Sequence, residues 1–346
     1  MPTTTPRQDS PPTRPPRDRR RRRVIVITLL GWVAANAVAL AAAGRALPFD
    51  WPGVGDRSAA GQVLDADLRA LEALLIIALA YALTRRRAVP VPELAARAPG
   101  RRAALRETLL LLAYGACGLL GGFVLARAFG WHPFGFHLAG SVFGTHEHVA
   151  PAEALTWACY NAAVYGVVPL LWFGRRHPAA ALNLTSRDRR ADARLVAVVL
   201  LVESVVQFAA LRPAIVGLDG AQLALGVPLT FALFLLGAVL PAMVFIYCLL
   251  VPRFLRLTGS VAATVVLGGL TYAAMHLWDA WTVFDSPGHA ALSIVFLLFT
   301  YVPPGMVKTT LTVRTGNAWV HVWAYHALVP HTLVDTPHVT HVFGIR

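Results

Sequence analysis

Residues 227–251 read VPLTFALFLLGAVLPAMVFIYCLLV, an apolar stretch of 25 residues without one charged side chain. An α-helix of this length rises about 37 Å, which exceeds the roughly 30 Å hydrocarbon core of a bilayer. The whole chain agrees with this stretch, because 56% of its 346 residues are hydrophobic and only 14% are charged. This composition excludes a soluble enzyme, a coiled coil and a disordered binding protein.

Similar apolar runs lie on both sides of this stretch. Eight further runs occur, at 24–44, 68–83, 108–129, 154–173, 195–211, 261–278, 290–303 and 318–333. We therefore expect an all-α, polytopic transmembrane helical bundle of eight or nine spans. Gly118 and Gly122 form a small-xxx-small pair, which predicts close packing between two of these helices.

The chain divides into three parts by composition. Residues 1–23 contain eight arginines and almost no apolar residue, which predicts a disordered cytoplasmic tail. The run 24–44 resembles a signal peptide, but about 20 apolar residues is long for one, so we expect an uncleaved first span. Residues 24–224 then hold the N-terminal transmembrane helices, and residues 225–346 form a transmembrane core with a histidine-rich end.

The net charge of +13 suggests nucleic acid at first, but its distribution is that of membrane topology. Lys and Arg in short loops stay on the cytoplasmic side, and alternate connections of this chain are basic. They hold Arg85, Arg86, Arg87, Arg97, Arg101 and Arg102; Arg175, Arg176, Arg187, Arg189, Arg190 and Arg194; Arg253 and Arg256; and Lys308 and Arg314. We expect an integral protein of a bacterial plasma membrane with its N-terminus in the cytoplasm, with membrane lipid and no nucleic acid among its partners.

Ionisable groups inside spans are the candidate site residues, because each costs at least about 2.5 kcal/mol to insert. Glu203, His276 and His326 come from three different runs, and a carboxylate with neutral imidazoles is an ordinary ligand set for zinc. The sequence therefore predicts a divalent metal, with zinc the first choice, in an open catalytic site. The alternative is that each histidine bonds a backbone carbonyl, as buried polar groups in membranes must.

Other polar residues close to these three extend the predicted site. His331 is a further candidate ligand, but residues five apart are displaced about 140° around a helix, so joining His326 requires a break, which Pro330 can supply. Asp279 and Asn317 are expected to orient imidazole rings. Candidate partners of the substrate or of these groups are Lys308, which is the single lysine of the chain, Arg314 and Asp335.

From about Leu225 to the end, the chain resembles the CPBP family of intramembrane peptidases, also called the CAAX-protease and bacteriocin-processing or Abi family. Tyr272-Ala-Ala-Met-His276 matches the family's aromatic-x-x-x-His motif. Arg314-Thr-Gly-Asn-Ala-Trp, followed by His326-Ala-Leu-Val-Pro330, matches the surroundings of its His-x-x-x-Asn/Asp motif, with Pro330 in place of the last residue. Where the family has Glu-Glu-x-x-x-Arg, this chain reads Pro241-Ala242-Met-Val-Phe-Ile246.

In that family a glutamate is expected to activate water, so its absence leaves two main hypotheses. In the first, Glu203 replaces it, and the chain is a divergent metal-dependent hydrolase acting on a hydrophobic peptide or lipid. In the second, the same fold is a non-catalytic membrane protein that binds such a ligand or supports other lipid chemistry. A transporter with a buried proton relay is a third class, although we see none of the internal symmetry common in transporters.

Overall fold

The computed structural model describes residues 16–42, 58–140, 148–278 and 282–346, and within these ranges all regular secondary structure is helical. The first half contains α1 (Pro16–Ala42), α2 (Ala59–Thr84), α3 (Val91–Ala96), α4 (Arg101–Ala128), α5 (Pro151–Asn161), α6 (Val168–Gly174) and α7 (Arg189–Val216). The second half contains α8 (Val227–Phe234), α9 (Leu240–Ala242), α10 (Val251–Thr258), α11 (Val261–Ala274), α12 (Pro287–Thr315), α13 (Trp319–His326) and α14 (Thr336–Phe343). The all-helical prediction is confirmed.

Five continuous helices in the described ranges are long and apolar enough to cross a membrane, and this makes the chain an integral membrane protein by composition. They cover Arg19–Ala41, Arg101–Ala128, Pro151–Gly174, Gln222–Thr258 and Pro287–Thr315. Val261–Ala274 is a shorter apolar helix. Helices α2 and α7 cover the predicted runs 68–83 and 195–211, but a total of eight or nine spans stays a prediction.

The stretch 227–251 lies in one long helix of alternating α and π segments. The π segments are η2 (Gln222–Gly226), η3 (Leu235–Val239) and η4 (Met243–Leu250), and a similar one, η1 (Ala162–Val167), joins α5 to α6. A proline stands at the start of each α segment that follows, namely Pro169, Pro228, Pro241 and Pro252. Because proline has no backbone N–H, it cannot donate the usual i→i−4 bond, and the wider π turn precedes it.

Two predicted boundaries differ from the structure. Helix α1 begins at Pro16, so residues 16–23 belong to a helix and not to the tail, whose residues 1–15 lie outside the described ranges. Pro16 takes the first helical position, for which its fixed φ is suited, and arginine is a good helix former. The run 318–333 is two segments, because α13 ends at His326 and π segment η5 (Val329–Leu333) contains a kink. Leu328 has φ −144°, Pro330 has ψ 124° and His331 has φ +58°, which confirms the break expected at Pro330.

Close helix packing depends on glycines that leave no room for a side chain. Helix α11 lies along α12, and a Cβ on Gly269 would stand 2.8 Å from the backbone oxygen of Val302. A Cβ on Gly118 would meet the ring of Tyr165, and one on Gly122 would stand 3.0 Å from the backbone oxygen of Phe134. The prediction that the Gly118–Gly122 pair mediates close packing is therefore confirmed.

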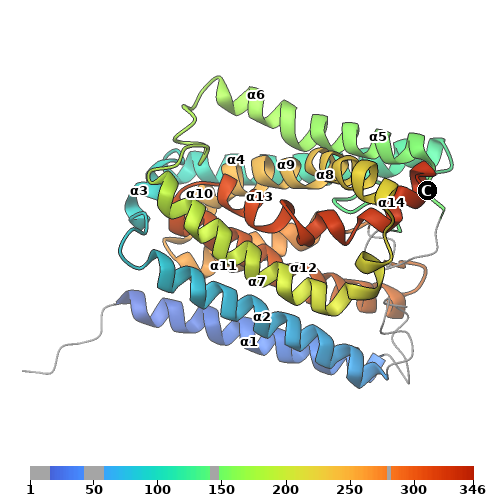
Figure 1. Ribbon diagram of the computed structural model, residues 1–346. Coiled ribbons are helices and arrows are strands. Elements are labelled where there is room, and N and C mark those ends of the chain that lie inside the picture. Colours follow the sequence, from blue (N-terminus) through green and yellow to red (C-terminus); the bar gives the residue numbers. More distant parts are fainter. Residues whose placement is uncertain (1–15, 43–57, 141–147, 279–281) are drawn as a thin grey trace, which may run out of the picture.

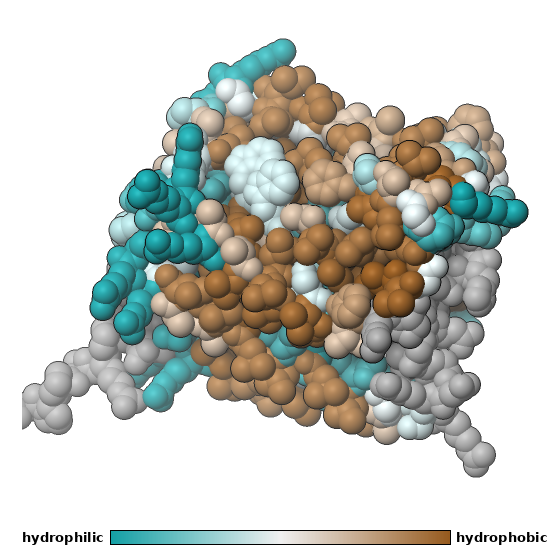
Figure 2. Space-filling model, in the orientation of Figure 1, coloured by the Kyte–Doolittle hydropathy of each residue, from teal (hydrophilic) through white to brown (hydrophobic). Residues whose placement is uncertain are grey.

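The basic connections meet at one end of the bundle, which is the left end in Figure 1. Arg87 Nη1 lies 2.6 Å from Asp192 Oδ1, and Arg97 Nη1 donates over 2.7 Å to the carbonyl oxygen of Gly316. Hydrophilic side chains gather at this end in Figure 2, and hydrophobic side chains cover the middle of the same face. The C-terminus lies at the other end of the bundle (Figure 1).

Candidate functional site

A small buried cavity of about 20 Å³ lies between α9, α11, α12 and α13. Its polar lining consists of six side chains, all of which can donate a hydrogen bond: His137, Tyr272, Lys308, His321, Tyr325 and His331. Its apolar lining includes Phe136, Phe234 and Ala242. This volume holds about one water molecule, so the cavity accommodates a single small polar group and not a whole hydrophobic ligand.

Lys308 is the charged group of this cavity. It lies on α12, is only 5% exposed, and its Nζ donates a hydrogen bond over 2.7 Å to the hydroxyl oxygen of Tyr272. The ammonium also lies 4.2 Å from the ring centroid of Tyr272 and 5.3 Å from that of Tyr325, within the range of cation–π attraction. The lone lysine is thus placed where a charge is costly, which marks a functional candidate.

Glu203, the predicted general base, lies on α7 and is 5% exposed. Gln207 Nε2 donates to its Oε2 over 3.3 Å, and the hydroxyl of Tyr325 also donates to this carboxylate. Glu203 lies close enough to Lys308 for the two charges to interact. The carboxylate is therefore held by a helical neighbour, a tyrosine and a counter-charge, which is the arrangement expected for a structural and electrostatic role.

His276 and His326 are both buried and both bond a backbone carbonyl. His276 Nδ1 donates over 2.7 Å to the oxygen of Tyr272, and its ring stacks on Tyr301 with centroids 3.7 Å apart. His326 Nε2 donates over 2.8 Å to the oxygen of Phe231, on which its ring also stacks. Each imidazole therefore retains one nitrogen with a free lone pair, as a metal-ligating histidine would.

A third ligand does not join them. Among the described residues, no group of three or more His, Cys, Asp or Glu side chains is arranged to hold a metal ion. Within these ranges Glu203, His276, His326 and His331 are therefore not assembled as a ligand set, and the predicted metal stays a prediction. The donor set present fits hydrogen bonding and ion pairing.

The other predicted site residues fall into two places. His331 lines the cavity beside Lys308, and its Nδ1 lies 3.8 Å from Oδ2 of the fully buried Asp335. Asn317 and Arg314 belong instead to the network at the basic end. Asn317 Nδ2 donates over 2.9 Å to Asp192, and Arg314 Nε donates over 2.8 Å to the hydroxyl of Thr84.

Asp279 lies outside the described residues. Its predicted role in orienting an imidazole ring stays a prediction.

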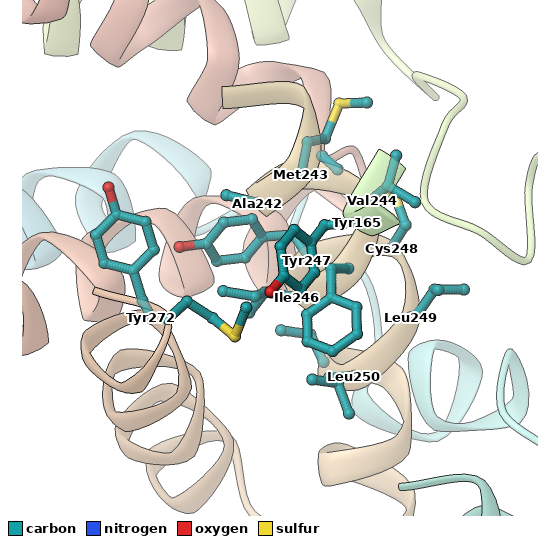
Figure 3. Packing of buried hydrophobic residues seen from close by; sticks show 14 of the residues in the cluster. Tyr165, Ala242, Met243, Val244, Ile246, Tyr247, Cys248, Leu249, Leu250 and Tyr272 are labelled. Atoms are coloured by element: carbon teal, nitrogen blue, oxygen red, sulfur yellow. The ribbon is translucent and has the colours of Figure 1, made fainter. Parts of the chain in front are cut away.

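The stretch Pro241–Ile246, which stands where the Glu-Glu-x-x-x-Arg motif was expected and lacks it, is part of the apolar core. Ala242 is 3% exposed and Ile246 is fully buried, and Figure 3 shows both in the same cluster as Tyr247 and Tyr272. Pro241 is buried as well. No acid or base is therefore contributed from these positions of the long helix.

Two cavity histidines, His137 and His321, were not among the predicted site residues. His137 lies in the connection between α4 and α5, where burial and then the charge of Lys308 lower its pKa to about 4, so it is neutral at pH 7. His321 packs on Tyr247, and within the described ranges its Nε2 has no hydrogen-bond partner. The spacing of His321 and Tyr325 on one helical face was a readable signal, whereas the position of His137 depends on how its long connection folds.

A larger groove of about 450 Å³ lies between α2 and α7, beside this centre. It is lined by Asp65, Leu68, Arg69, Leu71, Glu72, Leu75, Ile76, Leu79, Val202 and Val206. Its volume falls in the range of about 300–1,000 Å³ usual for ligand sites. Glu72 interacts electrostatically with Glu203, so the groove adjoins the charges that surround the small cavity.

Comparison of the chain with known protein families, with curated proteins and with solved structures found no match in any of the three. The geometry of the site therefore carries the functional argument.

Proposed function

We propose that this chain is a non-catalytic integral membrane protein that binds a hydrophobic ligand, a lipid or a peptide, in the groove between α2 and α7. The observation that carries the proposal is the groove itself, which is mostly apolar, has room for a ligand and adjoins a buried charged centre. Concave, largely apolar sites with a few polar groups are the usual form of small-molecule sites.

The polar centre supports binding without turnover. Gln207 and Tyr325 donate hydrogen bonds to Glu203, and Lys308 donates one to Tyr272, so both groups have partners before any ligand arrives. A general base needs to be within hydrogen-bond reach of the proton that it removes. Among the described residues, the polar lining of the adjoining cavity contains no carboxylate that could activate water there.

A metal-dependent hydrolase is the second candidate, and one observation favours it. His276 and His326 each keep a lone-pair nitrogen while the other ring nitrogen donates to a carbonyl, as in metal sites. The lack of a third ligand within the described part of the chain weighs against this candidate. Metal content of purified wild-type protein, beside the His276→Ala, His326→Ala double variant, separates the two hypotheses.

Binding is tested with a variant whose larger side chain fills the groove. Leu75 on α2 is 63% exposed and lines the groove, and Leu110 on α4 is 62% exposed and is not part of its lining. We expect Leu75→Trp to lose co-purified lipid or peptide, detected by native mass spectrometry, and Leu110→Trp to retain it. Equal retention by both variants would contradict binding in the groove. Near-stoichiometric zinc together with hydrolysis of a membrane peptide or lipid, both lost in the double histidine variant, would favour the hydrolase.

A further inference from the structure

The connection between α4 and α5 dips into the bundle before α5 begins. The carbonyl oxygen of Gly135 accepts a hydrogen bond over 2.8 Å from Nδ2 of Asn161. Asn161 is the last of the 11 residues of α5, so this carbonyl lies about 15 Å below the start of that helix. The backbone N–H of Phe136 donates over 3.1 Å to the carbonyl oxygen of Met275, just after α11. This non-helical segment is therefore re-entrant, and it brings Phe136 and His137 to the lining of the small cavity.

Backbone outside a helix is found at this depth only where protein covers it or where it lines a cavity that holds water. The cavity of about 20 Å³ has room for one water molecule, and a buried water needs two to four polar partners. The contents of the cavity are therefore decided by the lining side chains that still have a hydrogen bond to give or to accept.

Two side chains of the lining have hydrogen-bonding capacity that the described residues do not fully use. The ammonium of Lys308 carries three N–H groups and donates one hydrogen bond, to the hydroxyl of Tyr272. His321 is 2% exposed, and its Nε2 has no hydrogen-bond partner within the described ranges. Because the hydrocarbon around the bundle offers no hydrogen bonds, these groups require a partner inside the protein.

Tyr325 has the opposite character at the cavity. Its hydroxyl hydrogen is donated to the carboxylate of Glu203, so only the lone pairs of its oxygen remain for the cavity. A cation in the cavity would be repelled by the ammonium of Lys308, and an anion would be repelled by these lone pairs and by the adjoining carboxylate. A single water molecule both donates and accepts, so it suits both kinds of partner and adds no charge.

We infer that the cavity binds one water molecule, which accepts a hydrogen bond from Lys308, donates one to the hydroxyl oxygen of Tyr325 and shares one with Nε2 of His321. Three bonds are the usual number for a buried water. The water completes a hydrogen-bonded chain from the ammonium of Lys308 through Tyr325 to the carboxylate of Glu203, which joins the two buried charges. This site is separate from the groove between α2 and α7, and it does not depend on the ligand proposed there.

A high-resolution crystal structure of the full-length protein tests the site directly. We expect density for one water molecule about 2.7–3.2 Å from Nζ of Lys308 and from Nε2 of His321. A well-ordered cavity without this density would overturn the inference. Crystals grown in bromide are the control for charge, because an anomalous peak in the cavity would identify an anion site and would equally overturn it.

Unfolding of a variant with a ring of similar shape tests the same site in solution. His321→Phe removes one partner of the water, so it should raise the equilibrium constant of unfolding about ten-fold, as the loss of one buried hydrogen bond does. His341→Phe, at an exposed ring outside the cavity, should change this constant by less than about two-fold. An unchanged or lowered constant in His321→Phe would overturn the inference, because in a dry cavity the substitution only removes a nitrogen that has no partner.

Discussion

The electrostatic interaction between Lys308 and Glu203 predicts energetic coupling that a double-mutant cycle measures. Lys308→Met removes the hydrogen bond to Tyr272 and leaves Glu203 without its counter-charge. Breaking a buried ion pair in direct contact costs about 3–5 kcal/mol, which is an upper range for two charges that interact over a longer distance. We expect a loss of about 3 kcal/mol in the free energy of unfolding, the low end, because Gln207 and Tyr325 still donate to Glu203.

The second arm of the cycle removes the carboxylate charge but keeps its shape. Glu203→Gln alone should cost about 1–2 kcal/mol, the usual loss for a hydrogen bond to a charged group. In the Lys308→Met background it should cost little or even stabilise the protein, because no unpaired charge then remains. The expected coupling energy is about 1–3 kcal/mol.

The assay is reversible unfolding in mixed micelles of sodium dodecyl sulfate and a mild detergent, followed by circular dichroism. Arg256→Met is the control, since it removes a positive charge from the exposed last turn of α10. Combined with Glu203→Gln, it should be additive to within about 0.5 kcal/mol. A coupling between positions 308 and 203 below about 0.5 kcal/mol would refute the interaction of these two charges and, with it, the charged centre beside the groove.

Three further predictions concern packing, pH and topology. Gly269→Ala should destabilise the protein by about 1–3 kcal/mol in thermal unfolding, because its Cβ would stand 2.8 Å from the backbone oxygen of Val302. The control is Gly166→Ala, which should be neutral or slightly stabilising because no atom lies within 4 Å of the new Cβ. Burial lowers the pKa of His137 to about 4 in the folded state, so between about pH 6.5 and 4 the unfolded chain binds one proton more than the folded chain at this residue. Acidification through this window should therefore lower the free energy of unfolding by up to about 3 kcal/mol more in wild type than in His137→Gln. An identical pH dependence of thermal unfolding in the two proteins would contradict this. A periplasmic reporter fused after Arg346 should be active, because the C-terminus lies at the end of the bundle opposite the basic connections, whereas activity of a cytoplasmic reporter there would reverse the topology.

Much of the fold was predictable because apolar runs and glycine spacing are local signals. The run 227–251 is helical as expected, and the helix break at Pro330 follows from the missing N–H of proline and the constraint on the residue before it. The start of α1 was placed too late, because an arginine run reads as a solvated tail whether or not it is helical.

The site was predictable only in part, since contacts between distant segments leave no local pattern. Lys308 and His331 were predicted and line the cavity, whereas Arg314 and Asn317 were predicted and are part of the basic end. Glu72 was readable as a carboxylate inside an apolar run. Its position beside Glu203, more than 100 residues later, depends on the packing of α2 against α7.

The basic end also has a consequence for biogenesis. Arg97 bonds the carbonyl of Gly316, 219 residues later, and Arg87 bonds Asp192, 105 residues later. During synthesis these arginines first hold their loops on one side of the membrane, and their protein partners leave the ribosome only afterwards. Until then their charges face water and lipid phosphates. A nascent chain stalled after α7 would therefore already have the correct membrane topology, yet its Arg97 would still lack the carbonyl partner at Gly316. The time at which Arg97 becomes protected from chemical modification would report when the last helices dock.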